Sequence, residues 1–305
     1  MKTTNRISRY LDPKLLATFG GLEVKARTVV EGFITGLHKS PFKGFNVEFA
    51  EYRQYAPGDP IKDIDWKIYA RTDKYYIKEH EEETNLSGYL VMDVSGSMSY
   101  KGDGKLSKMD YAATLAASLA YLMLRQQDSV GLVTFSDGVR RIIRPKSGMS
   151  HIKAICGELE NTKPIEGTNI SESLDRVAET MRKRGVLIIF SDLMDNAELV
   201  IAKARQLRSR RHEVVIFHVL DRHEISFPFE DITLFKDLED KSEIIADTFA
   251  LRNEYLKKIT SLINTFQSAL RKSGIDYILA DTSRTLESNL KSFFTRRQSF
   301  GSALM

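Results

Sequence analysis

The sequence predicts an α/β fold in which helices cover both faces of a doubly wound, mostly parallel sheet. From residue 86 onward, short apolar runs alternate with longer amphipathic segments in the order β-α-β-β-α-α-β-α-β-α-β, and this alternation is typical of such sheets. The run at residues 186–190 is apolar throughout, as expected of a central parallel strand buried on both faces. The ligand site of such a fold is expected at the carboxyl edge of the sheet.

Each element of this domain follows from a local pattern of apolar residues and turn residues. The expected strands span residues 88–94, 129–135, 139–143, 186–190, 214–220 and 275–280. The expected helices span residues 107–127, 149–159, 170–184, 196–210, 251–272 and 286–297. Ser136-Asp137-Gly138 separates two strands as a turn, which predicts one antiparallel hairpin at the sheet edge. Shorter alternating pieces within residues 227–247 predict a second hairpin.

The N-terminal part of the chain has a different pattern. Residues 15–37 predict two helical pieces, broken by Gly20-Gly21 and by Gly32. Strands are expected at residues 45–55 and from residue 75, with a short helix between them. We therefore expect an N-terminal helical and β-strand extension over residues 1–85, an α/β domain over residues 86–298, and a frayed tail at residues 299–305.

Composition favours a cytoplasmic globular protein. Charged residues make up 28% of the 305 residues and apolar residues 42%, and the formal net charge of +4 is too small to indicate nucleic acid as a partner. The single cysteine, Cys156, excludes an intramolecular disulfide and fits a reducing compartment. Residues 1–13 contain no apolar core of a signal peptide. The apolar segment at residues 112–124 is too short to span a bilayer, so no transmembrane segment is expected.

The most informative motif is Asp93-Val94-Ser95-Gly96-Ser97, which directly follows an expected buried strand. One carboxylate and two hydroxyls at alternate positions offer three hard oxygen ligands from a single loop. Such ligands suit Mg²⁺ or Mn²⁺ better than soft metals. Taken alone, the motif favours a Ser/Gly turn at a strand end over a metal site.

Two later positions complete a candidate site. Thr168 lies in a loop before an expected helix, and Asp192 directly follows the buried strand at residues 186–190. Either could also serve as a helix cap. However, Asp93 and Asp192 are expected at the same sheet edge, where two carboxylates repel unless a cation or proton separates them. The sequence therefore predicts Mg²⁺ or Mn²⁺ bound by Asp93, Ser95, Ser97, Thr168 and Asp192.

Together these five positions resemble the metal-ion-dependent adhesion site of von Willebrand factor A domains, which implies a Rossmann-type sheet. The upstream segments resemble the signature of a bacterial family, domain of unknown function number fifty-eight, often encoded beside MoxR-type AAA+ ATPases. The segments that carry this resemblance are Glu48-Phe49, Arg53-Gln54-Tyr55, Pro57-Gly58-Asp59, Ile64-Asp65-Trp66-Lys67 and Ala70-Arg71. Many relatives carry N-terminal membrane helices and a β-rich insert, and this chain shows neither.

The resemblance implies an adaptor whose metal keeps one coordination position for a carboxylate from a protein partner. That partner is expected to be a MoxR-type AAA+ ATPase or its client. No His or Lys is expected near the site to act as a general base, so we expect no catalysis. One alternative is a metal-dependent phosphohydrolase that uses Asp93, although Ser95 stands where such enzymes need a second acid. Another is nucleic-acid binding through the basic run from Lys203 to Arg211.

Overall fold

The computed structural model describes residues 21–38, 52–56, 64, 66–78, 87–165, 167, 169–181, 184–238 and 241–301. Its contacts divide the chain into two compact units, one of residues 37–85 and one of residues 1–36 with 86–305. In the smaller unit, strand β1 (Tyr52–Gln54) pairs antiparallel with β2 (Tyr76–Lys78), and helix α3 (Trp66–Thr72) lies between them in the sequence. The rings of Tyr69 and Tyr75 stack at 4.5 Å and join this helix to the segment that leads into β2.

The larger unit is built around a six-stranded sheet with the strand order β10-β7-β6-β3-β4-β5. All neighbouring strands pair in parallel except β4 and β5, which form an antiparallel hairpin at the edge. The strands are β3 (Ser87–Asp93), β4 (Ser129–Phe135), β5 (Val139–Lys146), β6 (Val186–Ser191), β7 (Glu213–Leu220) and β10 (Asp276–Asp281). The predicted α/β class, with its doubly wound and mostly parallel sheet, is therefore confirmed.

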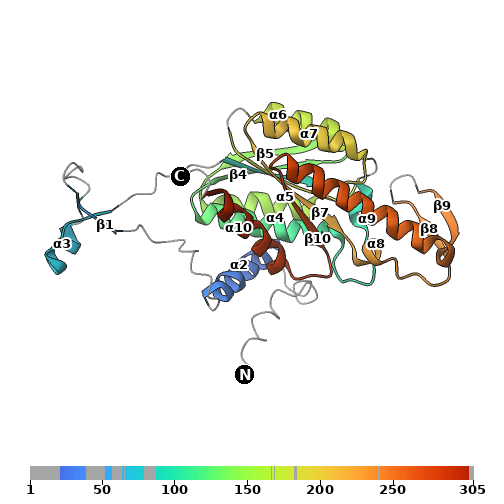
Figure 1. Ribbon diagram of the computed structural model, residues 1–305, viewed down its shortest axis with the longest axis horizontal. Helices are drawn as coiled ribbons and strands as arrows, with labels where there is room; N and C mark the ends of the chain where they lie inside the picture. The colour runs from blue at the N-terminus through green and yellow to red at the C-terminus, as the bar shows by residue number, and fades with distance from the viewer. Residues whose placement is uncertain are drawn as a thin grey trace, which may run out of the picture. The chain divides into compact units, whose positions relative to one another are not determined.

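Helices cover both faces of this sheet (Figure 1). One face carries α6 (Ile170–Thr180), α7 (Ala197–Ser209) and α9 (Thr248–Lys272), and the other carries α4 (Lys108–Arg125), α5 (Ile152–Asn161) and α10 (Leu286–Gly301). Short 3₁₀ helices occur at η3 (Gly96–Ser99) and η4 (Met149–His151). Beyond β7, the short helix α8 (Arg222–Ser226) leads to an antiparallel hairpin of β8 (Ile232–Lys236) and β9 (Glu243–Asp247).

Burial explains why these segments form a sheet. Every residue of β6 is buried, and the Phe190 ring stacks on Phe217 of β7 at 5.1 Å. Helix α4 begins with a capping box in which Ser107 and Asp110 exchange hydrogen bonds, and most of its residues are buried. Among the described residues, no helix is long and apolar enough to cross a bilayer.

Several boundaries differ by a few residues from those expected, including those of α2 (Leu22–His38) and α10. Helix α2 runs unbroken through Gly32, so the break predicted there is wrong. One glycine costs a helix only about 1 kcal/mol relative to alanine, and the buried face that includes Val29 and Phe33 outweighs it. The Phe33 ring stacks on Phe294 of α10 at 5.5 Å, so α2 packs within the larger unit. Helix α10 continues to Gly301, past the expected end of the last helix.

Candidate metal site at the sheet edge

The strand order places a topological switch point at the ends of β3 and β6. The chain runs from β3 outward to β4 and β5, then returns to the other side of β3 with β6. The carboxyl ends of two parallel strands at such a switch point are the usual ligand site of an open α/β sheet. Asp93 is the last residue of β3, and Asp192 directly follows β6. The register pairs Met92 with Phe190, which places the two carboxylates at neighbouring strand ends.

The loop after β3 gathers three of the predicted ligands. One oxygen of the Asp93 carboxylate accepts a hydrogen bond from the Ser95 backbone N–H at 2.9 Å. The other accepts one from the Ser191 hydroxyl at 2.6 Å. The Ser95 and Ser97 hydroxyl oxygens lie 3.1 Å apart, and a hydrogen bond from Ser97 helps to lower the pKa of Asp192. The structure therefore brings together Asp93, Ser95, Ser97 and Asp192.

Thr168, the fifth predicted ligand, lies outside the described residues, so its place in the site stays a prediction. The segment before it is anchored beside the Asp93 loop, because the Ile165 N–H donates to the Val94 carbonyl at 2.8 Å. After it, Asn169 caps α6 by accepting a hydrogen bond from the Glu172 N–H.

Asp93 carries a carboxylate with unbalanced charge. The side chain is fully buried, and burial together with the charge of Asp192 raises the pKa of Asp93 to about 7, despite the hydrogen bonds from two serines. Among the described residues, no Lys or Arg forms a salt bridge with Asp93. A cation bound at this position would stabilise its ionised form.

Lys108 is the residue of this site that sequence reasoning missed, and it contradicts the expectation that no lysine lies nearby. Its buried ammonium group is 2.8 Å from Asp192 Oδ2 and 2.6 Å from Glu224 Oε1. Burial lowers the pKa of Lys108, but the two carboxylates outweigh burial and hold the pKa above its ordinary value. Lys108 therefore keeps its proton at neutral pH and is unsuited to act as a general base.

A signal for Lys108 does exist in the sequence. Lys108 is the first residue of α4, where the positive end of the helix dipole disfavours a cation. A lysine at this position is balanced either by water or by a carboxylate, and the sequence leaves both open. The partners lie 84 and 116 residues further on, so no local pattern identifies them.

His218 supports the backbone of the site and is not a second base. Its Nε2 lies 2.8 Å from the Asp192 carbonyl oxygen, and its Nδ1 lies 2.7 Å from the Tyr277 hydroxyl. Because a carbonyl only accepts, Nε2 carries the hydrogen and Nδ1 accepts from the tyrosine. Burial lowers the pKa of His218 to about 4, so the ring is neutral with both nitrogens engaged.

The donor set at the sheet edge fits a hard divalent cation. Within the described part of the chain, no group of three or more His, Cys, Asp or Glu side chains is placed to hold a metal ion. A cation here would therefore be bound by carboxylates together with serine hydroxyls. Oxygen donors of this kind suit Mg²⁺ or Mn²⁺. Lys108 already engages one oxygen of Asp192, so Asp93 with Ser95 and Ser97 forms the primary donor group.

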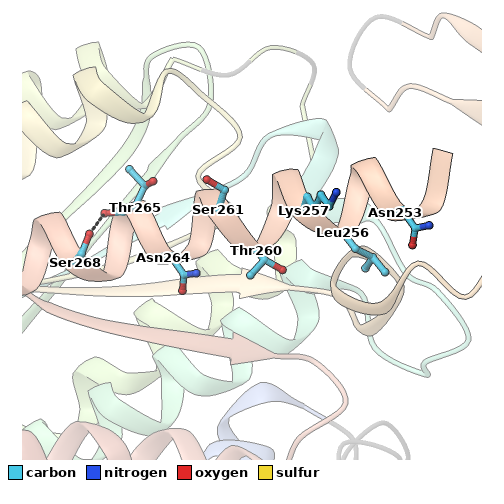
Figure 2. A pocket seen from close by; sticks show the side chains of 8 residues that line it. All are labelled: Asn253, Leu256, Lys257, Thr260, Ser261, Asn264, Thr265 and Ser268. Atoms are coloured by element: carbon cyan, nitrogen blue, oxygen red, sulfur yellow. Dashed lines mark hydrogen bonds between the residues drawn. The ribbon is translucent and has the colours of Figure 1, made fainter.

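A surface groove of about 810 Å³ lies along helix α9, away from the ends of β3 and β6, and is not a candidate site. Figure 2 shows that all the side chains lining it come from one helix, α9, so it is an open groove along a helix surface. Its lining is mostly uncharged and polar, and Lys257 is its only ionisable side chain. Such a surface offers no group of ligands comparable to that at the ends of β3 and β6.

Comparison with known proteins identifies the family. The chain is 24% identical over 295 residues to the uncharacterized protein Mb1516 of Mycobacterium bovis, covering 94% of this chain and 91% of that protein. A solved structure of an aerotolerance-related membrane protein from Bacteroides fragilis is similar at a TM-score of 0.48 and 18% identity, over 68% of this chain and 96% of that chain. The SpRpn10 VWA domain is similar at a TM-score of 0.40 and 13% identity, over 67% and 93% of the two chains. The family model of DUF58, described as a protein of unknown function, matches residues 51–262, which include Asp93, Lys108 and Asp192. The chain therefore belongs to the DUF58 family.

Proposed function

We propose that this protein is a non-catalytic adaptor that docks a carboxylate of a partner protein through a divalent cation. The cation would be held by Asp93, Ser95, Ser97, Thr168 and Asp192. The observation that carries the proposal is the fully buried Asp93, which lies beside a second carboxylate and two hydroxyls and forms no salt bridge among the described residues. A buried carboxylate without a positive partner is costly, so the site is suited to bind a cation.

Different residues of the chain would supply charge, neutral oxygens and orientation to the ion site. Asp93 supplies negative charge, while Ser95 and Ser97 supply neutral oxygens that do not cancel the charge of the cation. When bound, Mg²⁺ or Mn²⁺ supplies a positive centre with room for an external oxygen ligand. The Ser191 hydroxyl and the Ser95 N–H fix the orientation of the Asp93 carboxylate.

Catalysis is not part of the proposal, because the lysine and the histidine at the site are both occupied. Lys108 is protonated between two carboxylates, and both nitrogens of His218 are hydrogen-bonded. Neither residue is free to remove a proton from a water molecule or a hydroxyl group.

The partner proposed is a MoxR-type AAA+ ATPase, or a client that the two proteins assemble or activate in the cytoplasm. This choice rests on the resemblance of the sequence to a family often encoded beside such ATPases. The chemistry of the site adds a requirement, because the contacting residue of the partner must be Asp or Glu.

Metal binding is tested first, by calorimetric titration of the purified protein with Mg²⁺ and Mn²⁺. Asp93→Ala should abolish binding, and Ser97→Ala should weaken it. Ser99→Ala is the matched control, because the Ser99 hydroxyl bonds to the Gly96 carbonyl and is not part of the donor group. Equal affinity in all four proteins would refute the site.

Partner binding is then tested by pull-down of the MoxR-type ATPase from the same genome. Wild-type protein should retain the ATPase in Mg²⁺ and lose it in EDTA. Asp93→Ala and Asp192→Ala should fail in both conditions. Retention that is indifferent to EDTA and to both substitutions would exclude docking through a metal.

A phosphohydrolase is the second candidate, and the buried lysine is the observation that favours it. Enzymes that form an aspartyl-phosphate need a nucleophilic Asp and a nearby Lys. Here Lys108 contacts Asp192 rather than Asp93, Ser95 replaces the second acid, and the nucleophile would be fully buried. Hydrolysis of p-nitrophenyl phosphate by wild type, abolished in Asp93→Asn, would favour this candidate over the adaptor.

The basic run on α7 gives little support to nucleic-acid binding. Lys203 pairs with Asp175, and Arg205 donates a hydrogen bond to the Ser273 hydroxyl. Arg208 donates one to the His212 carbonyl oxygen. These side chains serve contacts within the protein. Steeply salt-dependent retention of DNA or RNA would be needed to restore this alternative.

A further inference from the structure

An apolar pocket of about 400 Å³ opens between helices α8 and α9 and the β8–β9 hairpin. Its wall includes the five aromatic side chains of Tyr100, Phe227, Phe229, Phe235 and Tyr255. Phe227 stacks on Tyr255 at 4.4 Å and on Phe235 at 5.9 Å, so these three rings form one cluster. Aromatic walls with a few polar groups are typical of ligand pockets.

The pocket shares two residues of its wall with the surroundings of the candidate metal site. Tyr100 follows η3, and its N–H donates to the Ser97 carbonyl at 3.0 Å. Glu224 is also in the wall, and its carboxylate contacts the Lys108 ammonium group, which also contacts Asp192. The Lys108 ammonium lies 5.9 Å from the centre of the Tyr100 ring. One bound protein segment could therefore reach both places.

Charges around the pocket favour an uncharged occupant. Glu224 forms an ion pair with Lys108, which Asp192 shares, and Glu254 pairs with Lys258 at 2.7 Å. These are the acidic and lysine side chains of the wall, and each is paired. The remaining lining is mostly aromatic or aliphatic, so an aromatic or large aliphatic side chain fits it best.

Exposed apolar side chains also lie around the pocket, on the hairpin and at the start of α9. Ile244 and Leu251 line the pocket while 67% and 44% exposed. On the other face of the hairpin, Leu234 lies opposite Ile245, and both are exposed. Phe249, at the start of α9, is 82% exposed. Large exposed apolar side chains on both faces of this hairpin and at the start of α9 favour an interaction surface around the pocket.

We propose that the partner docks at two points: its carboxylate at the metal site and a nearby aromatic or large aliphatic side chain in this pocket. This inference rests on the proposed function and deepens it, because it specifies the recognised segment as an acidic residue with an apolar residue a few positions away. Burial of the apolar side chain supplies affinity, and the metal contact supplies orientation.

The proposal is tested with synthetic peptides and the full-length protein. The peptides are acetylated and amidated Gly/Ser heptamers that carry one Asp, one Phe, or both at spacings of one to four residues. Affinities are measured by calorimetry in Mg²⁺ and in EDTA. At one or more spacings, the Asp-Phe peptide should bind about tenfold tighter than the Asp-only peptide.

Two substitutions locate the gain. Ala246→Phe fills the pocket from β9, and Leu251→Asp places a charge on its wall in the first turn of α9, where an acidic residue is well tolerated. Both should remove the tenfold gain and leave binding of the Asp-only peptide unchanged. Ala202→Phe, at an exposed position of α7, is the matched control and should keep the gain.

The outcomes separate this inference from the proposed function. Binding of the Asp-only peptide in Mg²⁺, with no gain from Phe at any spacing, would overturn the inference and leave the metal dock intact. A gain that survives Ala246→Phe and Leu251→Asp would place the apolar contact elsewhere and also overturn it. A concentration-dependent dimer that Ala246→Phe and Leu251→Asp both dissociate would show that a second molecule of this protein fills the pocket, and would overturn the inference. Loss of all Mg²⁺-dependent binding would instead refute the proposed function.

Discussion

Replacing Asp93 by Asn should stabilise the metal-free protein, which is the opposite of the usual effect of changing a buried polar residue. The Asp93 carboxylate has its pKa raised from 3.8 to about 7 by burial and by Asp192. Because the folded state binds this proton more tightly than the unfolded state, the contribution of Asp93 to stability falls as pH rises from about 4 to about 7. Asparagine has nearly the same shape and carries no charge to bury.

The size of the effect follows from the change in pKa. A difference of about 3 between the folded and unfolded pKa values corresponds to about 4 kcal/mol at a pH above 7. The change also disturbs the hydrogen bond from Ser191, which costs about 1 kcal/mol. At pH 8 in EDTA we therefore expect the free energy of unfolding of Asp93→Asn to exceed that of wild type by about 3 kcal/mol. At pH 4, where wild-type Asp93 is protonated, the gain should vanish.

The assay is urea denaturation followed by far-UV circular dichroism at pH 4, 6 and 8. Tryptophan fluorescence is unsuitable, because the only tryptophan is Trp66, which lies in the smaller unit. Each titration is repeated with saturating Mg²⁺, which should stabilise wild type at pH 8 and leave Asp93→Asn unchanged. A variant less stable than wild type at pH 8 in EDTA would show that Asp93 is not an uncompensated charge. Equal stabilisation of both proteins by Mg²⁺ would place the ion elsewhere.

Three further predictions concern the surroundings of the site. Lys108→Met should lower the free energy of unfolding by about 3–5 kcal/mol, because it leaves two carboxylates without their cation; an unchanged urea midpoint would contradict the ion-pair geometry. Gly185→Ala should lower the melting temperature, because the added Cβ would lie 2.1 Å from a backbone carbonyl oxygen. Its control, Gly157→Ala in α5, has open space around the new methyl group and should gain about 0.5–1 kcal/mol. His218 has its pKa lowered from 6.5 to about 4. Because the unfolded state binds this proton more tightly, the free energy of unfolding should fall by about 3 kcal/mol as pH falls from about 6.5 to about 4. His218→Gln should flatten this part of the pH profile of unfolding, and an unchanged slope would refute the assignment.

The sheet could be predicted because its strands are buried on both faces. An unbroken apolar run such as that of β6, flanked by amphipathic helices, is typical of a central parallel strand and of few other structures. Because Asp93 and Asp192 each lie at the end of such a run, the sequence alone places both at the carboxyl edge of the sheet, and the observed strand order makes the two strands neighbours. The helix break expected at Gly32 is wrong, because glycine signals a break only when no packed face holds the helix together.

The electrostatics of the site could not be predicted to the same degree. Lys108 meets carboxylates that follow it by 84 and 116 residues, and their convergence depends on how α4 and α8 pack. Sequence spacing carries no information about such packing. The expectation that no lysine lies near the site is therefore wrong, because Lys108 contacts Asp192. Its chemical consequence, the lack of a free lysine or histidine base, now rests on the pKa of Lys108 and on the tautomer of His218.

The charge count at the sheet edge gives a reason why the proposed dock for an acidic partner would need a divalent cation. Asp93, Asp192 and Glu224 carry three negative charges when ionised, and Lys108 returns one positive charge. Without a metal the site therefore carries two net negative charges in a buried environment and repels a carboxylate. A proton on Asp93 removes only one of them, whereas Mg²⁺ removes both and offers the partner a positive centre. Removal of the metal should thus convert attraction into repulsion, so that partner binding in EDTA becomes weaker as the salt concentration falls. Tighter binding in EDTA at low salt would show that the partner meets the protein through a different, basic surface.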